Sequence, residues 1–102
     1  MDIIAIYVTH KDMNNAQKVT DHLFRMKLIA CANYFPITTQ YVWKNGIEVG
    51  QEVVSIYKTK TQNREKVKEA IKWVHPYQIP CIMKMPVEVN HAYGNRVTEN
   101  VA

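Results

Sequence analysis

Apolar residues fall in short runs along the chain, and their spacing predicts where strands and helices lie. Ile3 to Val8 is a continuous β-prone run without polar alternation, which is typical of a central strand covered on both faces. Asp12 follows this run and is a candidate N-cap. A helix is expected after it, because four apolar residues recur there at helical spacing: Ala16, Val19, Leu23 and Met26.

A long hairpin is predicted in the middle of the chain. Leu28 to Phe35 is predicted as a second strand, and Pro36 is expected either to bend it or to place its missing donor at an unpaired edge of the sheet. Residues 38–43 are rich in β-branched and aromatic side chains and lead into Asn45-Gly46, a pair that favours the positive φ angles of a tight turn. The return strand is expected over residues 47–59, with a bulge at Gly50.

The second half of the chain predicts one more helix and one more strand. Residues 61–74 carry a helical apolar stripe, and Thr61 or Asn63 is the expected cap. Residues 82–89 alternate, which predicts an edge strand whose methionines and valines form the buried face. The tail over residues 91–101 is ambiguous by pattern, and a short C-terminal helix is the prediction.

This order of elements predicts an α+β fold. Strand, helix, strand, hairpin, strand, helix and strand form a ferredoxin-like split βαβ sandwich, with an antiparallel sheet and both helices on one face. The length of 102 residues fits a single domain over residues 1–102. Tyr41 and Trp43 in the hairpin add apolar surface that so small a domain cannot bury alone. We therefore expect a homo-oligomer in which the open sheet face, Tyr41 and Trp43 pack against neighbouring copies.

Composition and charge exclude several classes of function. The net charge is +4, but the basic residues are spread along the chain, so nucleic acid is not an expected partner. The two cysteines, Cys31 and Cys81, form no CxxC pair, which favours a reducing compartment. Asp2 stands where a signal peptide would be basic, and the run from Ile3 to Val8 is too short to span a bilayer. A cytoplasmic protein without membrane association is the prediction.

Residues that carry chemistry gather in the segment from His75 to Pro80 and in Cys81, which follows it. Pro76 disfavours helical geometry in the residue before it, so a helix arriving from residue 63 should end at this corner. One interpretation is that the prolines and His75 only stop the helix. The other is a metal site with His75 and Cys81 as ligands, to which a neighbouring copy would add His10, Asp12 or Tyr77, because a stable site needs three or four donors.

The signal for an enzyme is weak. Cys31 lies in an apolar run and is expected to be an inert core cysteine. Cys81 has no base and orienting carboxylate in a recognisable pattern. The chain is therefore predicted not to be an enzyme.

Four motifs follow one another along the chain and carry a family resemblance. Leu28 to Pro36 matches L-x-A-C-x-N-x-x-P, residues 41–43 match Y-x-W, Glu52 with Lys58-Thr59 resembles E…K-T, and residues 75–80 match H-P-Y-x-x-P. In these motifs the sequence resembles the CutA family of divalent-cation tolerance proteins. The resemblance implies a fold similar to the PII signalling proteins, a homotrimer, and a role in tolerance of divalent metals. It also implies copper or another divalent ion as ligand, with no organic cofactor and no enzymatic activity.

Two residues differ from the family pattern at positions where some members have ligands. Val8 stands where some members have a cysteine, and Cys81 stands where glutamate is common. A thiolate at that place favours softer ions such as Cu(I) or Zn. An alternative function is a PII-like trimeric sensor or scaffold, in which Lys58, His75 and Tyr77 line an intersubunit cleft for a small anion or a partner peptide.

Overall fold

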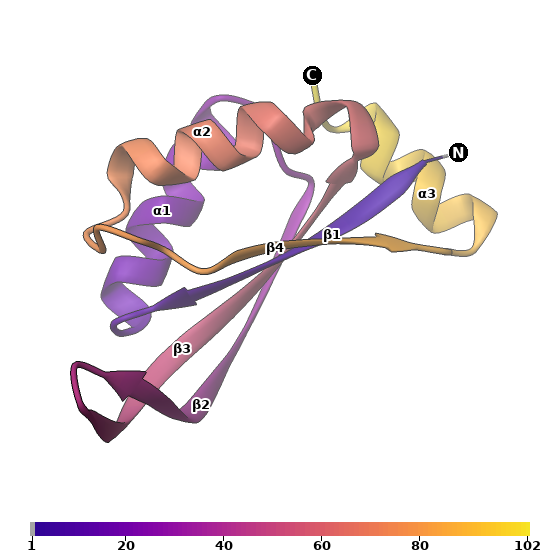
Figure 1. Cartoon of the computed structure of the whole chain (residues 1–102). Helices are drawn as coiled ribbons and strands as arrows, with labels where there is room; N and C mark the ends of the chain where they lie inside the picture. Colours follow the sequence, from indigo (N-terminus) through magenta and orange to yellow (C-terminus); the bar gives the residue numbers. More distant parts are fainter. Residues whose placement is uncertain (1) are drawn as a thin grey trace.

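The computed structural model of the protein describes residues 2–102. The elements in chain order are β1 (Ile3–His10), α1 (Met13–Arg25), β2 (Cys31–Trp43), β3 (Gly46–Lys60), a short 3-10 helix (Thr61–Asn63), α2 (Arg64–Val74), β4 (Ile82–Val87) and α3 (His91–Glu99). The strands form one antiparallel sheet in the order β2-β3-β1-β4. The predicted α+β fold and its short C-terminal helix are confirmed, and Figure 1 shows α1 and α2 on one side of the sheet with α3 apart from them.

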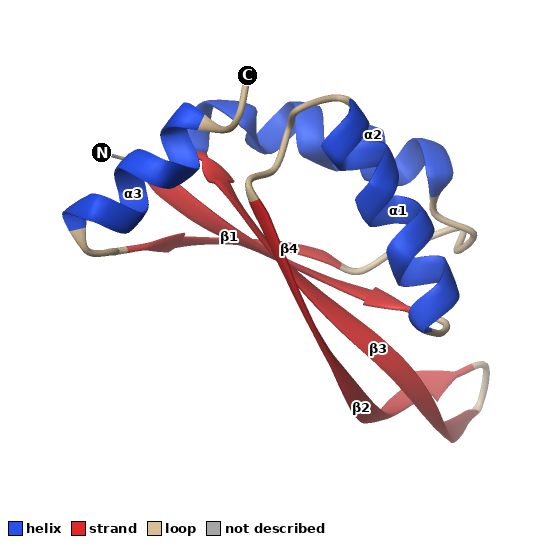
Figure 2. Cartoon of the chain, turned by 180° about the vertical axis from the view of Figure 1, so that it is seen from behind, coloured by secondary structure: helices blue, strands red, loops and turns tan. Residues whose placement is uncertain are grey.

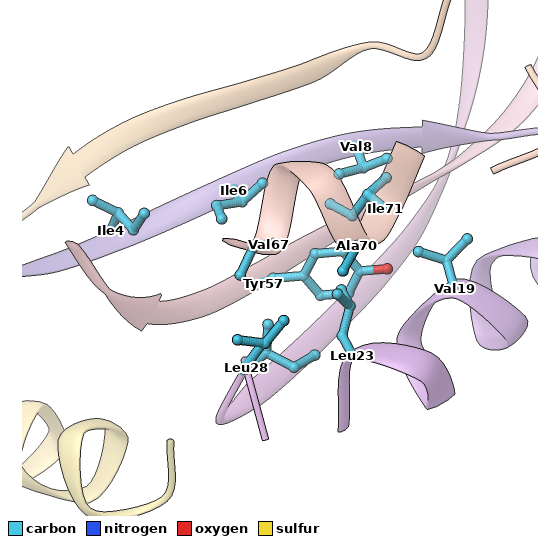
Figure 3. Packing of buried hydrophobic residues seen from close by; sticks show 11 residues of the cluster. Ile4, Ile6, Val8, Val19, Leu23, Leu28, Tyr57, Val67, Ala70 and Ile71 are labelled. Atoms are coloured by element: carbon cyan, nitrogen blue, oxygen red, sulfur yellow. The ribbon is translucent and has the colours of Figure 1, made fainter. Parts of the chain in front are cut away.

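The core lies between the sheet and the two helices α1 and α2. It combines almost fully buried side chains from β1, β3, α1, α2 and the segment between α1 and β2. Figure 3 shows them from close by: Ile4, Ile6, Val8, Val19, Leu23, Leu28, Tyr57, Val67, Ala70 and Ile71. Burial of large apolar side chains stabilises the fold by about 2 kcal/mol each. The hydroxyl of Tyr57 lies 2.8 Å from Thr20 Oγ1, so the polar end of this buried ring has a partner.

Both ends of α1 are set by local chemistry. The predicted cap is confirmed, since Asp12 accepts a hydrogen bond from the backbone of Asn15 at 2.8 Å. At the other end Lys27 has a φ of 57°, its N–H donates to the Phe24 carbonyl, and the Leu28 N–H donates to the Leu23 carbonyl. This pattern is a Schellman motif, and it turns the chain back so that Leu28 enters the core.

The second strand begins later than predicted and continues beyond Phe35. Residues 28–30 lie before β2, which begins at Cys31 and continues through Pro36 without a break. Of the two alternatives for Pro36, the position on an edge strand is confirmed: β2 lies at the edge of the sheet, where a missing donor is tolerated. The expected bulge at Gly50 was wrong, because Gly50 pairs with Thr39 in a continuous register.

The hairpin turn lies one residue earlier than the Asn45-Gly46 pair predicted. Trp43 pairs with Gly46, which makes Lys44 and Asn45 the two turn residues. The positive φ of 54° belongs to Lys44, and Gly46 has none. The pairing of the long strands sets the register, and this overrides the preference of the local dipeptide.

The start of α2 and the face of β4 also differ from the sequence prediction. Residues 61–63 form the 3-10 turn, and neither Thr61 nor Asn63 caps α2 through its side chain. The Asn63 amide instead donates to Thr59 Oγ1 and to the carbonyl of Ala102. Met83 and Met85, predicted on a buried face, are 47% and 38% exposed, because they pair beside Tyr7 and Ala5 on the face away from α1 and α2.

The tip of the hairpin extends beyond the rest of the sheet. β1 pairs with β3 only from residue 53 to residue 60, so the remaining part of β2 and β3 projects as a two-stranded ribbon (Figure 2). Large apolar side chains are exposed along it: Tyr41, Val42, Trp43, Ile47 and Val49. A two-stranded ribbon is marginally stable alone, so these side chains form a surface that another chain can cover.

Candidate functional site

The chain turns sharply between α2 and β4, and this corner contains the predicted site. α2 ends at Val74, as the proline pattern predicted, and His75 is its C-cap with extended backbone angles. The His75 N–H still donates to the Ile71 carbonyl at 2.8 Å, which joins the corner to the last helical turn. The position of His75 is therefore fixed by the helix that precedes it.

Both ring nitrogens of His75 already have hydrogen-bond partners. Its Nε2 lies 2.8 Å from the carbonyl oxygen of Thr9, which only accepts, so this nitrogen carries the proton. Its Nδ1 accepts from the backbone N–H of Tyr77 at 3.1 Å. Ligation of a metal by His75 therefore requires one of these two bonds to break.

A second histidine lies directly beside this ring. His10 is fully buried, its ring stacks on that of His75 with centroids 5.3 Å apart, and its Nε2 lies 2.7 Å from Ser55 Oγ. Its Nδ1 is buried without a partner among residues 2–102. Burial, and then the neighbouring His75, lower the pKa of His10 from 6.5 to about 4. The ring of His10 is therefore neutral at physiological pH.

The outer side of the corner is acidic. Tyr77 Oη donates to Glu52 Oε2 at 2.8 Å, which ties the corner to β3. Burial, and then the hydrogen bond to Glu52, raise the pKa of Tyr77. Burial and the charge of Glu52 also raise the pKa of the Cys81 thiol. In the part of the chain that the structure describes, no lysine, arginine or histidine forms an ion pair with Glu52.

One copy of the chain does not bring enough donors together for a closed metal site. Across residues 2–102, no three histidine, cysteine, aspartate or glutamate side chains form a group that could hold an ion. The corner instead offers the Cys81 thiol and the Glu52 carboxylate, while His75 is occupied. A complete set of three or four donors therefore needs a contribution from outside this chain.

The two residues predicted to line a ligand cleft lie apart in one chain. Tyr77 contacts Glu52, whereas Lys58 lies six residues further along β3, about 20 Å away in an extended strand. Lys58 Nζ donates to Asn33 Oδ1 and lies 3.9 Å from Cys31 Sγ.

The prediction that Cys31 is a core cysteine was wrong, because it is partly exposed on the edge strand β2.

Sequence reasoning did not assign two of the residues that shape the corner. Glu52 was noted only as part of a motif, yet its carboxylate accepts the hydrogen bond of Tyr77 and its charge raises the pKa of the Cys81 thiol. Ser55 was not singled out, because a serine in a strand gives no signal until the fold places it beside His10. Tyr41 and Trp43 lie on the projecting hairpin, 46% and 57% exposed, where packing against another copy was predicted.

The fold and the corner together define the class of protein. The fold is a ferredoxin-like α+β sandwich, with an acidic, thiol-containing corner and an uncovered hairpin. The family model described as CutA1 divalent ion tolerance protein matches residues 4–100. The chain belongs to the CutA1 family.

Relatives of high coverage agree with this assignment. The divalent-cation tolerance protein CutA of Thermococcus kodakarensis is 39% identical over 95 residues, which cover 92% of this chain and 91% of the relative. CutA of Pyrococcus horikoshii is 40% identical over 92 residues, covering 89% and 90%. The chain thus matches these relatives over nearly their whole length.

Solved structures show the same fold. CutA1 of Pyrococcus horikoshii superposes with a TM-score of 0.93 at 37% identity, covering 97% of this chain and 98% of that one. CutA of Archaeoglobus fulgidus, which is described as periplasmic, gives a TM-score of 0.94 at 31% identity, covering 98% and 99%. Among the described residues, no helix has the length and hydropathy to cross a membrane. The cytoplasmic location stays a prediction.

Proposed function

We propose that the protein is a non-enzymatic divalent-cation tolerance protein that binds a copper or zinc ion through the corner between α2 and β4. The observation that carries this proposal is the carboxylate of Glu52, which has no ion-pair partner among the described residues and whose charge acts on the Cys81 thiol. A bound cation removes the electrostatic penalty that Glu52 imposes on thiolate formation. A thiolate and a carboxylate together suit Cu(I) and Zn better than hard cations.

In this proposal His75 positions the backbone of the corner, and the metal ligands are Cys81 and Glu52 on its outer side. The two hydrogen bonds of His75 fix the Thr9 carbonyl and the Tyr77 backbone in place. Groups that orient ligands change metal affinity by roughly 10–100-fold, so loss of His75 weakens binding even when it is not a ligand. Cys81 is exposed, which leaves its sulfur open to donors from a neighbouring copy.

Calorimetric titration with Cu(I) and with Zn tests the proposal. We expect Cys81→Ser and Glu52→Gln each to weaken binding at least about tenfold, and Cys31→Ser, the matched thiol control, to change it less than about twofold. Repeating the titration in buffers of different ionisation enthalpy should show release of the Cys81 proton on binding. X-ray absorption of the loaded protein should show sulfur ligation. Equal affinity in wild type and Cys81→Ser would reject the site.

We further propose that the working form is a homotrimer assembled through the open sheet face and the hairpin. The exposed side chains of the projecting ribbon, with Met83 and Met85, support this assembly, because a single copy leaves them in water. The expected solution mass is that of three chains. A trimer also supplies the further donors that one chain lacks.

Two tryptophans provide a matched test of the interface. Trp43 lies on the hairpin and Trp73 on α2, and both are exposed in one chain. We expect Tyr41→Ser with Trp43→Ser to raise the concentration at which the assembly dissociates by at least about tenfold, whereas Trp73→Ser leaves it unchanged. Light scattering across a dilution series measures this. A wild-type mass of one chain, or equal weakening by both variants, would contradict the proposed interface.

A further inference from the structure

Cys31 and Lys58 lie opposite each other on the paired strands β2 and β3. Their Cα atoms are partners in the register, and directly opposed side chains leave the same face of a sheet with Cβ atoms about 5 Å apart. Lys58 Nζ lies 3.9 Å from Cys31 Sγ. The strand pairing therefore holds a thiol and an amine in contact.

A single amide oxygen brings the two groups together. Asn33 Oδ1 accepts a hydrogen bond from Lys58 Nζ, and the Cys31 thiol donates to the same oxygen at 3.8 Å. The backbone of this region is also fixed, because the Ala30 N–H donates to the Lys58 carbonyl at 2.9 Å. Only the flexible four-carbon stem of the lysine has to move for its nitrogen to reach the sulfur.

The surroundings of Cys31 are cationic and partly open to solvent. Within residues 2–102, Lys58 forms no ion pair with a carboxylate. Tyr93 of α3 hydrogen-bonds to Cys31; burial, and then this bond, raise the pKa of Tyr93, whereas the charge of Arg96 lowers it. Redox-sensitive cysteines are typically accessible and lie beside cationic groups. Cys31 meets both conditions.

The other thiol of the chain has a different environment. Burial and the charge of Glu52 raise the pKa of Cys81. The thiolate is the form that peroxide oxidises, so these surroundings slow the oxidation of Cys81. Of the two cysteines, Cys31 is therefore the one that combines solvent access with an adjacent amine.

We propose that Cys31 and Lys58 form a reversible covalent cross-link, an S–N bond that closes when hydrogen peroxide oxidises the thiol. In the first step the sulfur loses two electrons to the peroxide. An S–O bond forms, the O–O bond breaks, and the thiol proton leaves with the second peroxide oxygen as water. The product of this step is a sulfenic acid on Cys31.

In the second step the nitrogen of Lys58 attacks the oxidised sulfur of Cys31. The S–N bond forms and the S–O bond breaks, as in the known condensation of sulfenic acids with nitrogen groups. The lysine ammonium loses two protons in this step. One goes to solvent, and the other leaves with the departing hydroxide as water.

The cross-link would act as a redox switch in this part of the sheet. It removes the positive charge of Lys58, and it protects the sulfur of Cys31 from irreversible oxidation to sulfinic acid. An added thiol reduces the S–N bond and restores both side chains. The cation site is separate, because Lys58 lies six residues along β3 from Glu52. Either proposal can therefore fail without the other.

Mass spectrometry of the full chain after treatment with hydrogen peroxide tests the proposal. The parent protein for every measurement is Cys81→Ser, because a disulfide between Cys31 and Cys81 would remove the same two hydrogen atoms. We expect the treated chain to be about 2 Da lighter, and its digest to contain a peptide pair joined between residues 31 and 58. Dithiothreitol should restore the original mass.

Two lysine variants of β3 locate the bond. Lys58→Arg keeps the positive charge but removes the attacking amine, so the yield of the joined peptides should fall at least about tenfold, and dimedone should trap the sulfenic acid instead. Lys60→Arg, two residues further along the strand, should cross-link as its parent does. Conversion of Cys31 to sulfinic acid without joined peptides, an unreacted thiol, or equal yields in the two lysine variants would overturn the proposal.

Discussion

The ring of His10 stacks on the ring of His75, with centroids 5.3 Å apart and planes 20° from parallel. One ring comes from the end of β1 and the other from the end of α2, so the stack joins the sheet to the helical layer. Both rings are buried, at 0% and 7% exposure. The corner that holds Tyr77 is thus built on a stacked pair of imidazoles, of which the His10 ring is neutral at physiological pH because its pKa is about 4.

Replacing His75 by alanine should destabilise the fold. The substitution leaves the Thr9 carbonyl and the Tyr77 N–H without their partners and opens a cavity beside His10. We expect a loss of about 3 kcal/mol in the free energy of unfolding. Urea unfolding at equal protein concentration measures it, and His22→Ala, on the half-exposed side of α1, should cost less than about 0.5 kcal/mol. Equal losses in the two variants would show that the His75 hydrogen bonds do not support the corner.

Stability should fall on mild acidification because of His10. Its pKa is about 4 in the folded protein against an ordinary 6.5, so between these values the unfolded chain binds more protons. The stabilisation is fully present above pH 6.5 and decreases as the pH falls toward 4, by about 3 kcal/mol in total.

The control for this pH dependence is a second histidine. His10→Gln should flatten the stability profile between pH 6.5 and 4, whatever its effect on stability at neutral pH, whereas His22→Gln should keep the slope. Denaturant unfolding at a series of pH values measures both. A wild-type profile that is already flat in this window would contradict a buried neutral His10.

Removing the charge of Glu52 should make Cys81 more reactive. The pKa of the thiol is raised by burial and by Glu52, and the thiolate is the nucleophile. Glu52→Gln should speed alkylation of Cys81 by iodoacetamide at mildly alkaline pH about threefold, measured by mass spectrometry of the Cys81 peptide. Glu48→Gln, an exposed acid on the hairpin part of β3, is the control and should leave the rate unchanged. A slower reaction in Glu52→Gln would mean that Glu52 acts on the thiol in another way.

Glycine at position 27 should stabilise the protein. Lys27 adopts a φ of 57°, a left-handed conformation that costs a residue with a Cβ atom about 1 kcal/mol and that glycine adopts freely. Lys27→Gly should therefore gain roughly 0.5–1 kcal/mol in thermal or urea unfolding. Lys18→Gly, in the middle of α1, should lose about 1 kcal/mol, because glycine disfavours a helix interior. If both glycines destabilise, the Schellman turn is not strained by its lysine.

Much of the fold follows from local patterns in the sequence. The apolar run at Ile3, the Asp12 cap and the end of α2 at Val74 each depend on neighbouring residues, through propensity, hydrogen bonding to the next turn and proline geometry. The order of these elements was enough to predict the sheet and the helices that cover it. The motifs around Cys31 and His75 also indicated the family, because a short sequence motif can be recognised without knowledge of the structure.

Tertiary structure determined which groups the residues of these motifs contact. Strand pairing moved the hairpin turn to Lys44 and Asn45 and placed Met83 on the open side of the sheet, because register depends on partners far away in sequence. The interpretation of the corner between α2 and β4 changed for the same reason. His75 looked like a free ligand in the sequence, but the fold gives both its nitrogens to the backbone of Thr9 and Tyr77. Glu52 acquired a role only when β3 brought its carboxylate to Tyr77 and close enough to act on the Cys81 thiol by its charge, since a through-space charge leaves no pattern along the chain.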